Sequence, residues 1–275
     1  MDVETVNNQR AICKFQRVDL IYKQILSIYS DNAGNVSGLK LGDDTSKILA
    51  FQSVSGGCGG STIAAACALH FASQGKKTLY LNLEKFGSAD SFFAADGQFD
   101  MSDIIYSLKS KKANFALKLE SCVKQDPRGV YFYSQSKVAL DMLEMNTEDI
   151  TKLISEIKLT GSYDVIIIDL DFSINKETLK ILHQTHSLIW VGDGSEISNL
   201  KLFRAFNALS IIEQNADAPL TSRISIIYNK FSNKTCKTLD DIGVKIIGGN
   251  PRFEHATTSM VLEEIASKDM FDKIL

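Results

Sequence analysis

One stretch of the 275-residue sequence decides the fold: Lys47 to Ala72 reads K-I-L-A-F-Q-S-V-S-G-G-C-G-G-S-T-I-A-A-A-C-A-L-H-F-A. An apolar run leads into a loop with four glycines, then a Ser-Thr pair and an alanine-rich segment. This order predicts a buried strand, a tight loop, and a helix whose positive N-terminal end faces the loop. Backbone N–H groups of such a loop converge on phosphate oxygens. A glycine-rich turn that merely ends a strand is the alternative, and it fits this order less well.

The loop supplies the candidate nucleotide-binding residues. They are Gly56, Gly57, Cys58, Gly59, Gly60, Ser61 and Thr62. The Ser61 hydroxyl is a candidate Mg²⁺ ligand. The loop has no cation, because Gly60 stands where phosphate loops ordinarily carry lysine, and no charged residue occurs from Ile48 to Gly75. Loss of a group that offsets the charge moving in phosphoryl transfer costs about 10²–10³ in rate. Nucleotide binding is therefore predicted more strongly than catalysis.

Short apolar runs alternate with segments of helical periodicity along the rest of the chain. Strands are predicted at Lys47–Ser53, Thr78–Leu83, Val130–Tyr133, Asp164–Leu170, Leu188–Val191, Ile224–Tyr228 and Val244–Ile247. Helices are predicted at Ser61–Gln74, Met101–Ser110, Asn114–Lys124, Thr147–Leu159, Lys176–Thr185, Ile197–Gln214 and Thr257–Lys268. This alternation is typical of right-handed βαβ units. We expect an α/β fold: a mainly parallel central sheet, helices on both faces, and the nucleotide at the carboxyl ends of the strands.

The first 46 residues differ from the rest. Val18–Tyr29 has apolar residues at helical spacing, and Ser30–Ser46 is rich in Gly, Asn, Asp and Ser, as linkers are. One helix and a linker cannot bury a core of their own. We therefore expect residues 1–46 to pack on the main domain or to be the tail of something larger, and residues 47–275 to form the nucleotide-binding domain.

The loop also resembles a known motif. V-S-G-G-C-G-G-S-T is similar to the deviant Walker A motif of the MinD/ParA superfamily of P-loop proteins, K-G-G-x-G-K-[ST]-T. Ser55 falls on the signature lysine of that motif and Gly60 on its ordinary lysine, so both lysines are absent. The resemblance implies ATP or ADP as ligand, Mg²⁺ as metal, and a homodimer in which the signature lysine reaches the partner subunit's phosphates. The missing lysines predict slow or absent hydrolysis.

Two later segments match acidic motifs of this superfamily. In L-Y-L-N-L-E, Asn82 and Glu84 fall on the two acids of its D-x-D motif, which makes Glu84 the candidate catalytic carboxylate. A solvated loop acid is the alternative interpretation of Glu84. The run Y-D-V-I-I-I-D has the Walker B pattern, an apolar strand that ends in an acid, and its Asp169 would support Mg²⁺ from the second coordination shell, through a bound water or through Ser61.

Two segments near the C-terminus match the superfamily's base-binding motifs. In I-I-Y-N-K-F, Asn229 falls where a strand-ending asparagine places its amide against the adenine edge. G-G-N-P-R-F resembles the turn that packs on the base, which makes Pro251 and Phe253 the candidate apolar walls. A plain turn-forming asparagine is the alternative for Asn229.

Two segments resemble one branch of the superfamily, the TadZ/CpaE proteins of Flp/Tad pilus systems. E-K-F-G-S-A-D-S-F-F follows the second strand, and K-F-Q-R-V-D-L-I-Y-K-Q-I-L-S-I-Y, Lys14 to Tyr29, is similar to the segment that joins a receiver-like domain to the ATPase domain. The resemblance implies an ATP-dependent dimeric scaffold for pilus assembly or localisation, with pilus-assembly proteins as partners.

Three other functions are weighed against this one. An active ParA-type ATPase that positions cargo on DNA would need a basic surface and a substitute cation, such as Lys85 or a partner's lysine. A capsule-type bacterial tyrosine kinase would carry a C-terminal tyrosine cluster, whereas the last tyrosine here is Tyr228. A nucleotide-free structural module is disfavoured by the intact loop.

Composition limits the partners and the location. The 30 Lys and Arg residues nearly balance the 33 Asp and Glu residues, so no nucleic-acid partner is expected. No apolar run approaches the ~20 residues that span a bilayer, and the acidic tail Ser259–Leu275 opposes binding to anionic lipid, so no direct membrane insertion is expected. The five cysteines show no C-x-x-C spacing, which is typical of reduced proteins. The expected location is the cytoplasm, with recruitment to a cell pole or a membrane site through partners.

Overall fold

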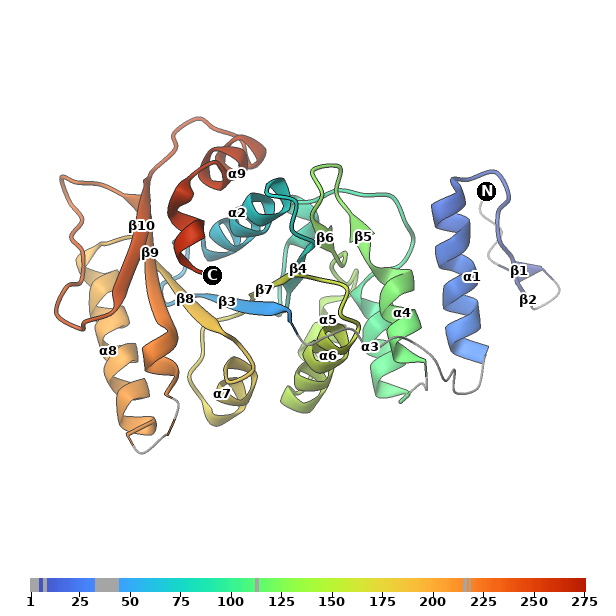
Figure 1. Ribbon diagram of the computed structural model, residues 1–275, viewed down its shortest axis with the longest axis horizontal. Helices are drawn as coiled ribbons and strands as arrows, with labels where there is room; N and C mark the ends of the chain where they lie inside the picture. Colours follow the sequence, from blue (N-terminus) through green and yellow to red (C-terminus); the bar gives the residue numbers. More distant parts are fainter. Residues whose placement is uncertain (1–4, 7–8, 33–44, 112–113, 215–216, 218) are drawn as a thin grey trace.

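A single large sheet runs through the centre of the protein (Figure 1). The computed structural model describes residues 5–6, 9–32, 45–111, 114–214, 217 and 219–275. The strands of the sheet are β3 (Lys47–Ser53), β4 (Thr78–Asn82), β5 (Lys124–Gln125), β6 (Tyr131–Phe132), β7 (Val165–Asp169), β8 (Ser187–Gly192), β9 (Ile224–Phe231) and β10 (Lys245–Pro251). Their order is β10-β9-β8-β3-β7-β4-β6-β5, and only the β5–β6 pair is antiparallel among these described strands. The predicted, mainly parallel sheet is confirmed.

Strand β3 lies in the middle of this sheet, between β7 and β8. Successive side chains of a strand point to opposite faces, and both faces of β3 are buried. Ile48 and Ala50 join the apolar core on one face, whereas Leu49 and Phe51 join the core on the other. The strand is therefore apolar throughout, and the glycine-rich loop that follows it leaves from the centre of the sheet's carboxyl edge.

One face of the sheet is covered by α2 (Gly60–Ser73), α9 (Thr258–Ala266) and a short 3₁₀ helix at Asp269–Lys273. Ala64, Ala65, Ala66 and Ala68 of α2 are all completely buried. These small side chains let α2 lie close to the strands. The imidazole of His70 fixes the C-terminal elements to α2: Nδ1 lies 2.8 Å from the Ala266 carbonyl, and Nε2 lies 2.9 Å from the Asp272 carboxylate.

The other face is covered by the remaining helices of the domain. They are α3 (Met101–Lys109), α4 (Phe115–Cys122), α5 (Ala139–Leu143), α6 (Thr147–Leu159), α7 (Lys176–Leu182) and α8 (Glu196–Ile212). Capping boxes explain where two of them begin: Asp100 accepts from the backbone of Ser102 at the start of α3, and Asn146 does the same for Asp149 at the start of α6. Helices on both faces were predicted and are confirmed.

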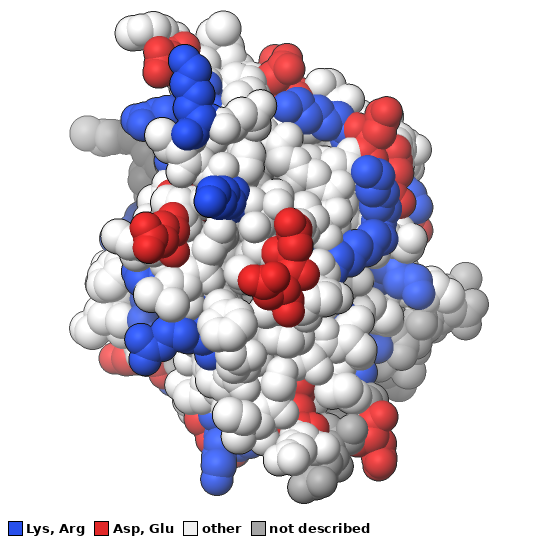
Figure 2. Space-filling model, turned by 90° about the vertical axis from the view of Figure 1, so that its left-hand side faces the viewer, with Lys and Arg blue, Asp and Glu red and all other residues white. Residues whose placement is uncertain are grey.

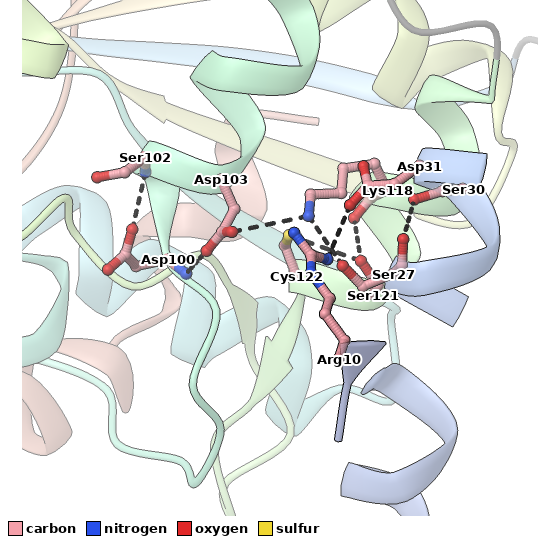
Figure 3. Close-up of polar contacts among 10 residues, drawn as sticks. All are labelled: Arg10, Ser27, Ser30, Asp31, Asp100, Ser102, Asp103, Lys118, Ser121 and Cys122. Carbon is pink, nitrogen blue, oxygen red and sulfur yellow. Dashed lines mark hydrogen bonds and ion pairs between the residues drawn. The ribbon is translucent and has the colours of Figure 1, made fainter. Parts of the chain in front are cut away.

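Helix α1 (Val18–Asn32) packs beside α4, at the β5 end of the sheet (Figure 1). It follows a small antiparallel pair, β1 (Thr5–Val6) and β2 (Gln9–Arg10). Polar contacts join α1 to α4 and α3 (Figure 3): the buried ammonium of Lys118 donates to Ser27 Oγ at 2.9 Å and lies 3.7 Å from an Asp103 oxygen. Helix α1 thus contacts the main domain through α4.

The outward side of α1 is apolar. Val18, Tyr22, Ile25 and Tyr29 recur at helical spacing and are 81%, 52%, 51% and 50% exposed, whereas the buried residues of the helix are Ser27 and Ser30. An ordinary surface helix shows the reverse, with its apolar stripe facing the core. The described residues of the main domain therefore do not cover the apolar side of α1.

Most element boundaries agree with the sequence to within a few residues. β3 and α6 have the predicted bounds, and the largest extension is at β10, which runs to Pro251 instead of Ile247. The short elements β5 and α5 were not predicted. Most of the predicted linker, positions 33–44, lies outside the described residues. No helix among the described residues is both long and apolar enough to cross a membrane.

Candidate functional site

The glycine-rich loop connects the carboxyl end of β3 to the N-terminus of α2. Gly57 and Gly59 have φ angles of 78° and 82°, which favour glycine. Gly59 also has a close neighbour, because a Cβ there would lie 2.5 Å from Asn229 Nδ2. Gly59 precedes α2 without a side-chain cap. The first N–H groups of the helix are therefore open to an anion, as in other phosphate loops.

At the position of the missing lysine, a side chain would contact Ser53 from its first carbon. A Cβ on Gly60 would lie 2.2 Å from Ser53 Oγ and 3.2 Å from Ser53 Cβ. The Ser53 hydroxyl is buried and forms no hydrogen bond with a described residue, as is also true of the hydroxyl of Ser55. Ser53 thus lies where the Cβ of a lysine at position 60 would be, and the sequence alone did not show this closeness.

Polar side chains meet beside the loop at the ends of β4 and β7. Asp169 accepts from Tyr80 Oη at 2.7 Å and from Asn82 Nδ2 at 3.0 Å. Glu84 accepts from Asn82 Nδ2 at 3.2 Å and from Ser61 Oγ at 3.1 Å. The structure therefore brings the predicted residues Ser61, Glu84 and Asp169 into one cluster. Sequence analysis did not anticipate Tyr80, a buried residue of a continuous apolar run.

The electrostatics of this cluster suit a cation. Burial, followed by the nearby Glu84 carboxylate, raises the pKa of Asp169 to about 8. Burial also raises the pKa of Tyr80, so its hydroxyl stays a donor. The hydroxyl and carboxylate oxygens of Ser61, Glu84 and Asp169 fit the preference of Mg²⁺ for oxygen ligands. No group of three or more His, Cys, Asp or Glu side chains that could hold a metal ion occurs among the described residues.

The other side of the loop contacts the end of β9. Asn229 Nδ2 donates to the Cys58 carbonyl at 2.8 Å, and Lys230 Nζ donates to the Gly57 carbonyl at 2.6 Å. The predicted residue Asn229 thus contacts the loop itself. Lys230 was missed in the sequence, although it directly follows Asn229; the available signal was a cation at the end of a strand that borders the loop.

The two candidate base-contacting residues lie at the end of β10. Pro251 is paired with Phe231 of β9 and is exposed. Phe253 is half-buried against the core that contains α2, and the ammonium of Lys268 lies 5.7 Å from its ring centre. Pro251 therefore lies at the same carboxyl edge as Lys230.

A hollow of about 960 Å³ is lined by residues that follow β4 and β7, among them Leu83 and Leu170. Lys85 and Phe86 line it, together with Asp171, whose carboxylate accepts from the backbone N–H of Lys85 at 3.0 Å. Sequence analysis considered Lys85 as a substitute cation, and in the structure Lys85 lines this hollow.

The arrangement is that of a P-loop α/β protein, and solved structures share it. A ParA family ATPase from Chlorobium tepidum TLS is 24% identical, with 84% of this chain and 96% of that chain covered and a TM-score of 0.64. MinD in the MinC:MinD cell division complex of Aquifex aeolicus is 19% identical, with 83% and 94% covered and a TM-score of 0.61. MinD complexed with Mg-ADP from Pyrococcus horikoshii OT3 is 15% identical, with 80% and 94% covered and a TM-score of 0.60. The chain has the MinD/ParA fold.

A second comparison concerns the N-terminus. Residues 1–30 match the family described as the TadZ-like receiver domain. This match covers β1, β2 and most of α1, and it agrees with the resemblance of Lys14–Tyr29 to TadZ/CpaE proteins. No curated protein matches the sequence significantly.

Proposed function

We propose that this chain binds ATP with Mg²⁺ and acts as a TadZ/CpaE-like dimeric scaffold in Flp/Tad pilus assembly or localisation, with slow or absent hydrolysis. One observation carries the proposal: the loop and the N-terminus of α2 lie beside Ser61, Glu84 and Asp169, while the position of the catalytic lysine is closed by Ser53. A site of this kind can hold a phosphate and its metal without the point charge that drives phosphoryl transfer.

In this proposal the loop N–H groups and the positive end of α2 hold the phosphates. Ser61 holds Mg²⁺, and Asp169 supports it from the second coordination shell, through a bound water or through Ser61. When bound, Mg²⁺ offsets the charge of the phosphate oxygens. Glu84 is the candidate for orienting an attacking water. Asn229, Pro251 and Phe253 are the candidates for holding the adenine, after Asn229 exchanges the Cys58 carbonyl for the base.

The match to a TadZ-like receiver domain supports the pilus branch. By resemblance, we propose residues 1–46 as the end of a receiver-like part and residues 47–275 as the nucleotide-binding domain. Pilus-assembly proteins are the proposed partners, and a homodimer formed around the nucleotide is the proposed assembly. The proposed location is the cytoplasm, with partners recruiting the protein to a cell pole or a membrane site.

An active ParA-type ATPase on DNA is the second candidate, favoured by the ParA-type fold. Such a function would need a continuous basic surface. On the face formed around α8, β9 and β10, the described acidic and basic side chains are interspersed (Figure 2). This distribution favours the scaffold over DNA binding at that face.

Calorimetric titration with ATP and Mg²⁺, with turnover measured on the same sample, tests the proposal. We expect saturable ATP binding, weakened at least tenfold when Mg²⁺ is removed or when Ser61 is changed to Ala. Ser73→Ala is the matched control, because this serine of the same helix donates only to the His70 carbonyl in the described structure. Turnover near 1 s⁻¹, the order of an ordinary phosphoryl-transfer enzyme, would contradict the scaffold, and absence of ATP binding would contradict the site.

A further inference from the structure

The end of β9 is irregular at the point where it meets the loop. The pairing of β9 with β10 shifts between Gly249 and Pro251, so that Asn229 and Lys230 together oppose one residue of β10. Lys230 has a φ angle of 59°, a left-handed conformation that non-glycine residues rarely adopt. Bulges of this kind re-aim side chains and are frequent beside active sites.

The bulge has a direct effect on where two neighbouring side chains point. In a regular strand, successive side chains lie on opposite faces of the sheet. Here Asn229 and Lys230 both reach the loop, and they bind two successive carbonyls, those of Cys58 and Gly57. A regular β9 could not direct both side chains there. The strained backbone of Lys230 therefore places an ammonium beside the phosphate loop.

The charges around the loop explain why an ammonium matters there. The loop and α2 carry no charged side chain, and the cluster across the loop contains the carboxylates of Glu84 and Asp169. A polyphosphate would add further negative charge at this place. Among the described residues, Lys230 is the cation hydrogen-bonded to the loop.

We propose that Lys230 is the phosphate-binding cation of this site, replacing from the end of β9 the lysines that are absent at positions 55 and 60. This inference rests on the proposed nucleotide binding. Lysine has a flexible four-carbon stem, and the Lys230 side chain is exposed. Its ammonium exchanges the Gly57 carbonyl for a phosphate oxygen when a nucleotide binds. Because the charge approaches from β9 and not from α2, it strengthens binding without occupying the catalytic lysine's position.

The experiment compares the affinities of AMP, ADP and ATP, each with Mg²⁺, for the wild-type chain and for Lys230→Met, Lys230→Arg and Lys234→Met. Lys234 is an exposed lysine four residues further along and serves as the matched control. We expect Lys230→Met to weaken ATP about 10-fold to 100-fold, the range of a charge-assisted hydrogen bond. AMP binding should change far less, because it offers fewer phosphate charges. Lys230→Arg should retain most of the ATP affinity, and Lys234→Met all of it.

A purely structural role would give a different pattern. If Lys230 only braces the loop through the Gly57 carbonyl, Lys230→Met lowers the melting temperature and weakens AMP and ATP by the same factor. That result overturns the inference, as does unchanged ATP affinity in Lys230→Met when the wild-type chain binds ATP. If the wild-type chain binds no ATP, the proposed function itself fails, and the inference fails with it. Recovery of ATP affinity in Lys230→Arg keeps the test decisive even if Lys230→Met folds poorly.

Discussion

Helices α2 and α1 lie in the same chain but are held in opposite ways. α2 is buried on nearly all sides, with four buried alanines against the sheet and His70 bound to the C-terminal elements. α1 buries two serines and turns its apolar side outward. Apolar burial is the main stabilising term in folding, whereas a buried polar contact gains little over its desolvation cost.

This difference distinguishes the helix that forms part of the core from the helix that is attached to it. α2 holds the phosphate loop in place because the core cannot form without it. The contacts that attach α1 include Lys118, a buried ammonium with one short hydrogen bond to Ser27 and an Asp103 oxygen at 3.7 Å, and Lys23, whose ammonium donates to the Val123 carbonyl. The contrast supports the proposed division of the chain into residues 1–46 and residues 47–275.

The largest expected effect separates the two helices directly. Phe71→Ala in α2 removes a ring that is 1% exposed, and we expect a loss of about 3–5 kcal/mol in the free energy of unfolding. Tyr22→Ala in α1 removes a ring that is 52% exposed, and we expect a change within about 0.5 kcal/mol. Urea denaturation of both variants measures the contrast. Equal losses would show that α1 is as much a part of the core as α2.

The next largest effect on stability is expected at Gly60, the first residue of α2. Gly60→Lys places a Cβ against Ser53, and we expect a loss of about 1–3 kcal/mol from overpacking. Adding Ser53→Gly removes the obstructing side chain and should restore part of this loss. Turnover of ATP should then rise only in the double variant, provided that Glu84 orients the water.

Thermal unfolding and phosphate release measure these two outcomes. Ser53→Gly alone is the control for the loss of the serine. A fully stable Gly60→Lys variant would contradict the steric argument, and no turnover in a stable double variant would mean that the acidic cluster cannot support hydrolysis.

A smaller effect on stability is expected in the turn before α2, where the contact between Gly59 and Asn229 can be tested separately. Gly59→Ala and Gly57→Ala both place an alanine at a positive φ, which costs about 1–2 kcal/mol. Only the Gly59 variant also meets Asn229, at 2.5 Å, whereas a Cβ on Gly57 has no neighbour within 4 Å. We therefore expect Gly59→Ala to be the less stable of the two in chemical denaturation. The opposite order would mean that Asn229 moves aside freely.

The smallest effect is expected where α1 is attached. Lys118→Met combined with Ser27→Ala replaces both partners of this buried contact with apolar side chains, and such paired exchanges are often neutral or stabilising. We expect the free energy of unfolding to change by no more than about 1 kcal/mol, with Lys176→Met, at an exposed position, as the control. A loss above about 3 kcal/mol would show that the Lys118–Ser27 contact holds the domain together.

The sequence was informative wherever local chemistry determines the structure. β3 was predicted with its bounds because its apolar run leads into the glycine-rich loop, and α6 because its apolar residues recur at helical spacing. The clustering of Ser61, Glu84 and Asp169 followed from their places at strand ends and at the start of α2. The roles of these residues in binding stay predictions.

Other features depended on contacts between distant segments. The closeness of Ser53 to Gly60 arises from the curl of the loop, and the orientation of Lys230 arises from a bulge between β9 and β10. The cation at the end of β9 was visible in the sequence, but its orientation was not, since lysine is an unusual residue at positive φ. β5 and α5 were missed because elements of 2 and 5 residues are too short to show a period.

The central place of β3 has a consequence for how the protein is made. Its neighbours β7 and β8 come much later in the chain: Ser46 binds Tyr163, 117 positions away, and Ile48 binds His186, 138 positions away. A ribosome that adds about 5–20 residues per second needs on the order of ten seconds to cover that interval. During this time β3 and the apolar helix after it have no sheet to join. The loop gains both neighbours of β3 only after β8 has been synthesised, so we expect the phosphate loop to take its folded shape late in synthesis.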